Sequence, residues 1–411
     1  MSEKDMSTAL SLEKQLIEDR RALHRIPECG VDLPQTTAYV KSRLDRLGVK
    51  YRDCGKMDDA DRNALAAWGY KGVSECSGIL AEIGTGQSPC ILLRGDMDAL
   101  PVHETTGLDF ASPGNTMHAC GHDTHTAMLL GAAAILKGRE SSLKGTVKLM
   151  FQPGEEVAIG ARAMINDGAL ENPKVDAAFA MHNGPYLPPG KAIYCLGESS
   201  GSLDTYALKI KGKGAHSSQP HLGIDPLMIV QQIYQALNTL LCRETDPAAF
   251  ATLNCGVIHG GAASNVIPDE ADLTFGFRTL NADTRNHLLK RIPQIVDATV
   301  KMWRGTYTCS ETHLPCTVCD IPLTKTLLPF IEEVLGEGSA EVHSCLGGAE
   351  DFAYVSEKVP SFLLYLGSGG EDTEQWPPLH NPGFHVDEKF LAQGAAVYAN
   401  CAVQWLKQYS A

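Results

Sequence analysis

The sequence predicts an α/β protein of two domains, with a βαββαβ domain inserted into a larger α/β domain. The chain has 411 residues, more than a single hydrophobic core usually organises. In its first and last parts, short apolar runs alternate with segments of helical spacing. The pattern changes after Pro188-Pro189-Gly190 and resumes near Leu314. We therefore expect an α/β domain over residues 1–198 and 314–411 and an inserted domain over residues 199–313.

The elements expected in the first part alternate between helices and buried strands. Helical spacing of apolar residues covers the segments 9–25, 34–47, 126–137 and 161–166. Short apolar runs predict strands at 78–83, 91–93, 147–151 and 175–181. Residues 53–72 lie between two strand signals and are expected to form a surface loop or short helix, with no function assigned.

The middle of the chain follows a different order. A strand at 205–210, a helix at 226–241, strands at 251–258 and 271–278, a helix at 283–302 and a strand at 306–309 are expected. This βαββαβ order is that of the ferredoxin-like two-layer sandwich. The α/β pattern then resumes with a helix at 323–334, a strand at 362–366 and a closing helix.

Composition and charge narrow the classes of partner. Hydrophobic residues make up 44% of the chain and charged residues 20%, which is typical of a globular protein. The formal net charge is −14 and no long Lys/Arg run is present, so neither nucleic acid nor an anionic membrane is an expected partner. The polar first residues and the lack of a long apolar stretch lead us to expect a cytoplasmic location.

Thirteen cysteines are spread along the chain. An odd number without a secretion signal argues against a disulfide framework. Cys316-x-x-Cys319 could belong to a zinc or redox site, but a single pair is a weak signal. We favour buried or free thiols.

The densest chemical signal is the segment Met117–His125 (MHACGHDTH), directly before an apolar helix. Thiolate and imidazole both suit Zn²⁺ and related divalent ions, and a loop could aim Cys120 and His122 at one centre. The alternative is a helix start that happens to be rich in histidine. Metal binding is the favoured interpretation.

Adjacent carboxylates follow the strand at 147–151, in the sequence Gln152-Pro153-Gly154-Glu155-Glu156. Ligand sites in open α/β sheets gather at the carboxyl ends of strands. One carboxylate could bind a metal while the other takes a proton from water. The alternative is an ordinary acidic first turn of a helix.

Three further polar residues occupy comparable places. His182 and Asp98 each follow a buried apolar run, and His380 lies in Leu379–Gly383 near the C-terminus. A single histidine is more often a core or surface residue than a ligand. Their position in the α/β part, at the expected edge of the sheet, favours a common site.

Taken together, these motifs resemble the dinuclear metallopeptidase and aminoacylase family. The likeness is strongest to the amidohydrolase branch of hippurate hydrolases, bacterial N-acyl-amino-acid hydrolases and plant auxin-conjugate (IAA-amino acid) hydrolases, which is marked by the Cys-Gly-His-Asp segment found here at Cys120–Asp123. It extends from Arg21–Glu28 (RALHRIPE) to His380. The resemblance implies hydrolysis of N-acyl amino acids with two divalent ions per subunit, Zn²⁺ or Mn²⁺ first and Co²⁺ or Ni²⁺ as alternatives.

The same resemblance implies roles for individual residues of the α/β domain. The implied metal ligands are Cys120, His122, Glu156, His182 and His380. Glu155 is implied as the general base. Asp98 is implied as an acid that orients the metal ligands without binding the metal itself.

In the inserted domain, the resemblance implies a lid and a dimerisation surface. His216 is implied to reach the active site of the neighbouring subunit, and Asn265 and Arg278 to hold the substrate's carboxylate. His221 recurs in this branch, but an ordinary turn histidine remains an open alternative. The implied assembly is a homodimer or a dimer-based tetramer.

Two rival functions remain open. A metallo-dipeptidase or carboxypeptidase would use the same chemistry, because a peptide is also an N-acyl amino acid. A non-catalytic metal-binding scaffold could keep the same fold, although it would not need the Glu155 base.

Overall fold

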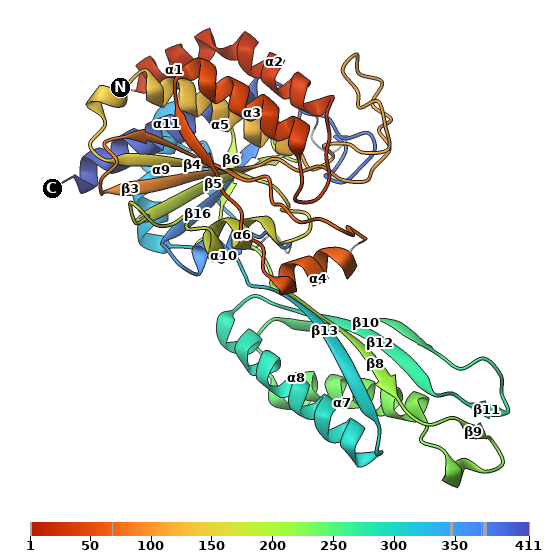
Figure 1. The fold of residues 1–411 in the computed structure, drawn as a ribbon. Coiled ribbons are helices and arrows are strands. Elements are labelled where there is room, and N and C mark those ends of the chain that lie inside the picture. Colours follow the sequence, from red (N-terminus) through yellow and green to blue (C-terminus); the bar gives the residue numbers. More distant parts are fainter. Residues whose placement is uncertain (1, 68, 346–347, 371, 373–375, 411) are drawn as a thin grey trace. The chain divides into compact units, whose positions relative to one another are not determined.

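The computed structural model describes residues 2–67, 69–345, 348–370, 372 and 376–410, which divide into two compact units (Figure 1). The first unit comprises Met1–Ser199, Val318–Cys345 and Asp351–Ala411. The second comprises Ser200–Thr317 with Leu346–Glu350. The chain thus passes between units one residue after the first expected boundary and four residues after the second.

The first unit is built on an eight-stranded mixed sheet of order β1-β2-β4-β3-β5-β16-β6-β15. Its strands are β1 (Lys50–Asp53), β2 (Ile79–Gly84), β3 (Cys90–Asp96), β4 (Thr146–Gln152), β5 (Ala177–Gly184), β6 (Ala192–Tyr194), β15 (Ala340–Val342) and β16 (Ser361–Gly367). The central strands β4, β3, β5 and β16 are mutually parallel. Every residue of β3, β4 and β5 is buried, as expected for strands covered on both faces. The carboxyl ends of these central strands therefore share one edge.

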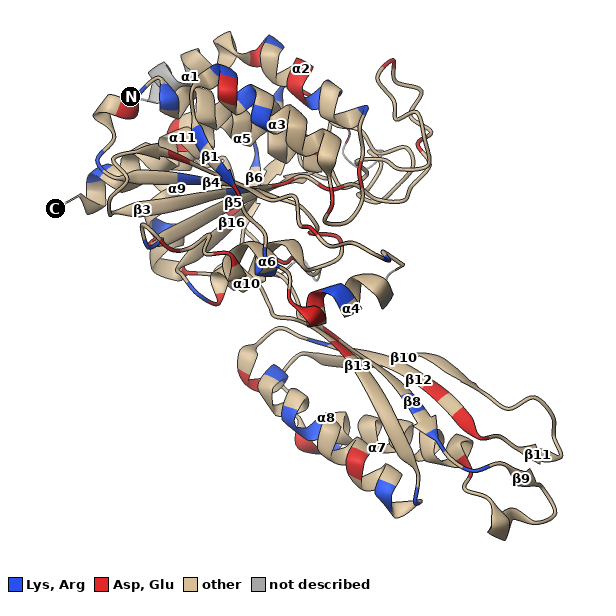
Figure 2. Ribbon diagram, in the orientation of Figure 1, with Lys and Arg blue, Asp and Glu red and all other residues tan. Residues whose placement is uncertain are grey.

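Helices cover both faces of this sheet (Figure 1). One layer contains α5 (His122–Lys137) and α11 (Phe390–Tyr409), with α1 (Ser2–Ser11), α2 (Glu13–His24) and α3 (Pro34–Leu47) packed outside them and α9 (Ile321–Leu335) against α11. The other face carries α6 (Gly160–Asn166) and α10 (Ala353–Ser356), which contact each other. Figure 2 shows acidic and basic residues interspersed along the outer helices.

Smaller elements complete this unit. Residues 53–72, expected to form a loop or short helix, contain the short helix α4 (Asp59–Ala67). A 3-10 turn, η1 (Glu140–Ser142), precedes β4, and β7 (Gly197–Glu198) pairs with β14 (Val318–Cys319). In the described part of the chain, no helix has the length and apolar character needed to cross a membrane.

The second unit has the expected βαββαβ order of long elements. These are β8 (Leu203–Lys211), α7 (Pro226–Glu244), β10 (Ala251–Gly260), β12 (Glu270–Thr279), α8 (Ala282–Met302) and β13 (Thr306–Leu314). The strands form an antiparallel sheet of order β10-β12-β8-β13, and α7 and α8 bury one of its faces. Asp225 and Asn281 accept hydrogen bonds as N-caps at the two helix starts. The second unit also contains two short paired strands, β9 (Ala215–His216) and β11 (Val266–Ile267), and the 3-10 turn η2 (Pro220–Leu222).

Two expected boundaries near the motifs with predicted metal ligands were wrong. Helix α5 begins at His122 rather than at residue 126, because Gly121 adopts a left-handed φ of 84° and its carbonyl oxygen accepts from the Thr124 amide. Strand β5 continues to Gly184, so His182 lies within the strand. The polar end of β5 remains in the sheet because β16 pairs with it as far as Gly184.

Candidate metal centre

Seven sequence-predicted site residues lie at the carboxyl edge of the central strands. Asp98 follows β3, Glu155 and Glu156 follow β4, and His182 stands near the end of β5. Cys120 and His122 lie at the start of α5, and His380 lies between β16 and α11. The parallel pairing of the central strands is what brings these distant segments to one edge.

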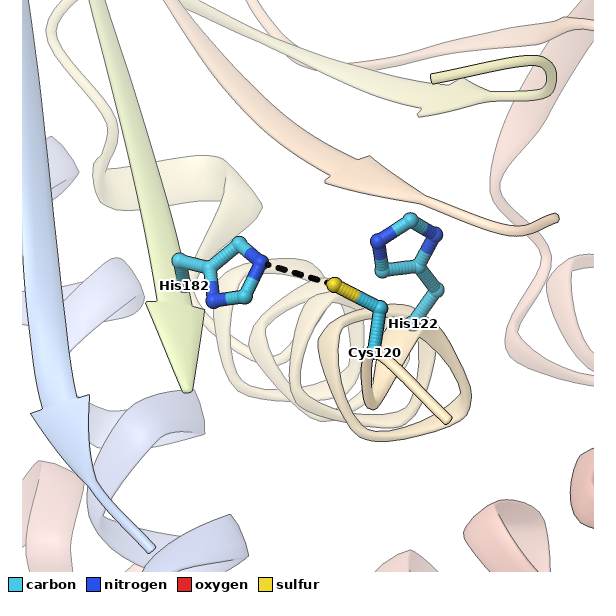
Figure 3. A group of neighbouring side chains, drawn as sticks. All are labelled: Cys120, His122 and His182. Carbon is cyan, nitrogen blue, oxygen red and sulfur yellow. Dashed lines mark hydrogen bonds between the residues drawn. The ribbon is translucent and has the colours of Figure 1, made fainter. Parts of the chain in front are cut away.

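Cys120, His122 and His182 form a buried group (Figure 3). The Nε2 atom of His182 lies 3.5 Å from the Sγ of Cys120. Nδ1 of His182 lies 2.8 Å from the carbonyl oxygen of Asn183 and donates a hydrogen bond to it. Nε2 of the neutral ring therefore presents its lone pair to the centre. Burial lowers the pKa of His182, which keeps the ring neutral and able to bind a metal.

Glu156 and His380 lie beside this group. His380 Nε2 is 3.4 Å from the Oε1 of Glu156, and ligand atoms of Cys120, Glu156 and His380 lie within 4.8 Å of one another. The neighbouring Glu156 carboxylate outweighs burial and raises the pKa of His380. Glu155 approaches from the same turn, with its Oε2 4.0 Å from the Nε2 of His122.

Asp98 supports three of these residues. Its two carboxylate oxygens accept hydrogen bonds from the backbone amides of Glu155 and Glu156, each at 3.1 Å. Its Oδ1 also lies 3.2 Å from the Nδ1 of His122. This contact holds the His122 ring so that Nε2 faces the centre, as carboxylates do for metal-binding histidines. Burial raises the pKa of Asp98 despite its contact with His122.

The residues present fit divalent cations. Nε2 of His122 and Oε1 of Glu156 are buried without a hydrogen-bond partner, which is costly for polar atoms. The His122 Nε2 lies 3.8 Å from an oxygen of Glu156, and two atoms bound to one ion at about 2.1 Å are at most about 4.2 Å apart. Thiolate, imidazole and carboxylate together suit Zn²⁺ and related ions.

The charges around the candidate centre also favour bound cations. Burial disfavours the charged form of His122, but the carboxylates of Asp96, Asp98 and Glu156 outweigh it and raise its pKa to about 10. Burial and the charges of Glu156, Glu155 and Asp96 raise the pKa of the Cys120 thiol well above its usual value. The centre therefore carries an excess of negative potential, which bound cations would neutralise.

Behind the centre lie His125 and Asn183, to which sequence reasoning assigned no role. The His125 Nε2 accepts hydrogen bonds from the backbone amide of Asn183 at 2.9 Å and from its side-chain Nδ2 at 3.0 Å. His125 Nδ1 must then carry the proton, and it donates to Asp96 Oδ1 at 2.6 Å. Asn183 Nδ2 also donates to the carbonyl oxygen of Cys120 at 2.6 Å. Asn183 thus ties the Cys120 loop to the end of β5.

Asp96 itself is held by a buried arginine. Arg94 donates through Nη1 to Asp96 at 2.6 Å and through Nη2 to Asp351 at 3.0 Å. Burial alone would raise the pKa of Asp96, but Arg94, His122 and His125 outweigh it and hold the pKa well below the usual range. Although Asp96 lies 3.8 Å from the His122 Nε2, its oxygens are already engaged by Arg94 and His125, so it supports the sheet edge.

The four remaining predicted residues belong to the second unit. His216 lies in β9, and its Nδ1 accepts a hydrogen bond from the Ser218 amide. Asn265 precedes β11, which pairs with β9, and it is exposed. Arg278 lies on β12 beside a hollow of about 260 Å³ on the sheet face away from the helices, and its Nη1 is buried without a hydrogen-bond partner. His221 is exposed in η2.

Comparison with known proteins places the chain in a family. Residues 92–404 match the model of peptidase family M20/M25/M40. The chain is 35% identical to N-acetyl-L-cysteine deacetylase of Bacillus subtilis (strain 168), covering 94% of this chain and 86% of the relative. It is 33% identical to IAA-amino acid hydrolase ILR1-like 2 of Arabidopsis thaliana, covering 96% and 85%. Thermostable carboxypeptidase 1 of Saccharolobus solfataricus is 32% identical, with 98% of each chain covered.

A solved structure shares the architecture. The Bacillus subtilis YXEP protein, described as a dinuclear metal binding peptidase from the M20 family, superposes with a TM-score of 0.74 at 31% identity and covers 97% of this chain and 99% of its own. The fold and the buried cluster define a metal-binding hydrolase of α/β class. The chain belongs to peptidase family M20/M25/M40 and is an amide hydrolase of that family.

Proposed function

We propose that the protein hydrolyses the amide bond of N-acyl amino acids and releases a carboxylic acid and an amino acid. The observation that carries this proposal is the buried Cys120, His122 and His182 group with the Glu155–Glu156 pair beside it. A deacetylase of N-acetylcysteine and a hydrolase of IAA-amino acids among the relatives support this substrate class.

The site would hold two divalent ions per chain. The residues that would hold these ions are Cys120, His122, Glu156, His182 and His380. Zn²⁺ or Mn²⁺ are the proposed ions, with Co²⁺ and Ni²⁺ as alternatives. Bound there, such ions polarise the amide carbonyl and lower the pKa of the attacking water.

Glu155 is proposed as the general base. Its carboxylate lies next to the ligand group, and its backbone amide is held by Asp98, which fixes the turn that carries it. Glu155 takes a proton from the attacking water and delivers it to the leaving amine nitrogen. Asp98 and Asn183 keep the ligands oriented throughout.

The second unit is proposed to act as a ferredoxin-like lid and dimerisation domain. Arg278 offers a planar guanidinium suited to the substrate's carboxylate, with Asn265 as a further donor. His216 is proposed to serve the active site of the partner subunit, where it would stabilise the developing oxyanion. His221 stays a candidate substrate contact. The assembly would be a homodimer or a dimer-based tetramer.

The proposed location is the cytoplasm. All thirteen cysteines are free thiols in the structure, which suits a reducing compartment.

A peptidase of dipeptides or of peptide C-termini is the second candidate. The carboxypeptidase among the relatives favours it, and its substrate shares the amide and carboxylate that this site would recognise. A panel of acetyl, benzoyl and indoleacetyl amino acids beside dipeptides separates the two, using protein stripped of metal and reloaded with each ion. We expect acyl amino acids to be hydrolysed faster than dipeptides, and only by reloaded protein. Faster cleavage of dipeptides would assign the peptidase function instead.

A further inference from the structure

Residues 53–76, of which the structure describes all but residue 68, include α4 and Tyr70 and have no part in the site described above. This segment packs as a small core of its own against the loop after α2 and the turn after β4. The core contains Val31, Met57, Ala64, Leu65, Cys76, Val157, Ile159 and Ala163, with Tyr70 and Val73 packed against it. Val157 directly follows Glu156, so this core borders the metal centre.

Polar contacts fix α4 in this place. Asp61, fully buried on α4, accepts a hydrogen bond from the Nε of Arg162 on α6 at 2.9 Å. The Lys56 amide donates to the carbonyl oxygen of Ala163, also on α6, at 2.9 Å. Figure 1 shows α4 next to α6, and Figure 2 shows the acidic start of α4. The segment 53–76 is therefore a fixed part of the first unit and forms a wall beside the metal centre.

Tyr70 packs directly on the chain segment that borders the centre. A Cβ added to Gly30 would lie 2.8 Å from the Cε1 of Tyr70, so the ring rests on the Gly30 backbone. The preceding residue, Cys29, forms a parallel β-bridge with Ala99, which follows Asp98. Tyr70 is thus separated from the centre by a single chain segment.

A second contact fixes the same loop against the base-bearing turn. A Cβ on Gly154 would lie 2.4 Å from the Cγ1 of Val31, so Val31 rests on the residue before Glu155. The charges of the centre also reach the wall. Burial and the neighbouring Cys29, Asp98 and Glu156 raise the pKa of the Tyr70 phenol. Tyr70 is only partly buried, so its ring retains surface that a ligand can contact.

We infer that Tyr70 contacts the acyl group of the substrate and that the segment 53–76 is a specificity element favouring aromatic acyl groups over acetyl. This inference rests on the proposed function, in which the substrate's carboxylate is assigned to Arg278 and Asn265. The acyl side of the amide is then left to uncharged groups of the first unit. A tyrosine ring offers edge-to-face or stacked contact to an aromatic acyl group, and acetyl is too small to use it.

The test compares kcat/KM for an N-benzoyl and an N-acetyl derivative of the same amino acid, with the metal-loaded full chain. Tyr70→Ala should lower the benzoyl-to-acetyl ratio about threefold to tenfold, the range expected for one aromatic contact. Tyr70→Phe should keep the wild-type ratio, because it keeps the ring. Tyr70→Leu retains apolar bulk for the small core and should lower the ratio as Tyr70→Ala does. Tyr409→Ala removes an exposed tyrosine at the end of α11 and should leave the ratio unchanged.

Inhibition by the product acids gives a second readout, because an inhibition constant reports binding of the acyl group and not the rate of its cleavage. Benzoate should inhibit the Tyr70→Ala and Tyr70→Leu variants about threefold to tenfold more weakly than wild type, and acetate equally in all. An unchanged ratio in both variants, or an equal change in Tyr409→Ala, would overturn the inference while N-acyl hydrolysis by wild type still stood. Wild-type protein that hydrolyses no N-acyl amino acid would overturn the proposed function, and this inference with it.

Discussion

Glu155 and Glu156 are neighbours in the chain, yet their carboxylates have different surroundings. Glu156 lies among candidate ligands, 3.4 Å from His380 and 3.8 Å from His122, and its Oε1 has no hydrogen-bond partner. Burial would raise its pKa, but His380, His122 and the Cys120 thiol outweigh burial and lower it. Glu156 is therefore suited to bind a cation, which leaves Glu155 for proton transfer.

Substitution of each carboxylate by the isosteric amide should separate these roles. Glu155→Gln should keep the metal and lose about 10²–10⁴-fold in kcat, because an amide cannot take the proton. Glu156→Gln should lose metal affinity, since it removes a charged ligand. Elemental analysis and kcat at saturating metal distinguish the two variants. Metal content that stays intact in both, with equal loss of kcat, would show that the roles are assigned wrongly.

Metal binding should release protons from the same centre. In the metal-free chain the pKa of His122 is about 10 and that of Cys120 is raised well above its usual value, so both hold protons at neutral pH. A ligand must give up its proton, so binding at pH 7 should release about one proton each from His122 and Cys120, together with a share from His380, whose pKa is also raised. Apparent affinity should therefore fall as the pH falls. Calorimetry in two buffers of different ionisation enthalpy measures the release, and Cys120→Ala should release about one proton fewer.

The proposed ligands could be found from the sequence because each stands in a short motif next to a strand or helix. The residues that hold them could not. Asn183 and His125 lie in those motifs, but their mutual contact depends on β5 and α5 meeting in space. Arg94 and Asp351 are 257 positions apart in the chain. No local pattern indicates a contact of that kind.

At the scale of elements, the start of α5 decides where Cys120 and His122 stand. Asp123 in its first turn accepts a hydrogen bond from the Nε of Arg20 at 2.8 Å, and its Oδ2 lies 2.8 Å from the Nδ1 of His24. All three side chains are at most 1% exposed. This buried group fastens α2 to the helix that carries two proposed ligands.

Asp123→Ala should therefore be strongly destabilising. It leaves the Arg20 guanidinium buried without its main partner, which typically costs about 3–5 kcal/mol. Burial would raise the pKa of Asp123, but Arg20 and His24 outweigh it and lower the pKa well below the usual range. The contribution of Asp123 to the free energy of unfolding is thus fully present above the ordinary aspartate pKa of about 4, and it is lost progressively as the pH falls below that value. Urea unfolding at pH 7 and at pH 3 should show the difference between variant and wild type shrinking in acid.

An exposed ion pair provides the control. Asp297→Ala breaks the pair of Asp297 and Lys301 on α8, where both side chains are exposed, and should change the free energy of unfolding by about 1 kcal/mol or less. A loss at Asp123 no larger than this would contradict the role given to the buried group.

The long elements of both units were predictable, because apolar periodicity and turn residues act locally. Helix α3 matches its expected range, and α7 begins at the expected Pro226. The short strands at or next to the edges of the sheet, β1, β6 and β15, were not expected, since each has few residues and forms only by pairing with a strand distant in the chain. The position of α4 also depends on partners distant in sequence, such as Arg162. Its place beside the centre could not be inferred from its composition.

At the scale of the whole molecule, every proposed metal ligand lies in the first unit, and His216 lies in the second. Chain order alone leaves open which site His216 serves. Its side chain is exposed on β9, so it is free to act outside its own unit. In a dimer, such an exposed residue could act at the active site of the neighbouring chain.

Mixing two inactive variants tests this arrangement. If His216 serves the partner's site, Glu155→Gln and His216→Ala homodimers should each be nearly inactive. In a mixed dimer, one site combines both defects, and the other has an intact Glu155 from its own chain and an intact His216 from its partner. Random exchange makes about half the dimers mixed, so activity should recover to roughly a quarter of wild type. Differently tagged subunits and a tandem pull-down establish that mixed dimers have formed. Confirmed mixed dimers without recovered activity would show that His216 acts within its own chain. In that case every site depends on a single chain, and each chain carries one of the two substitutions.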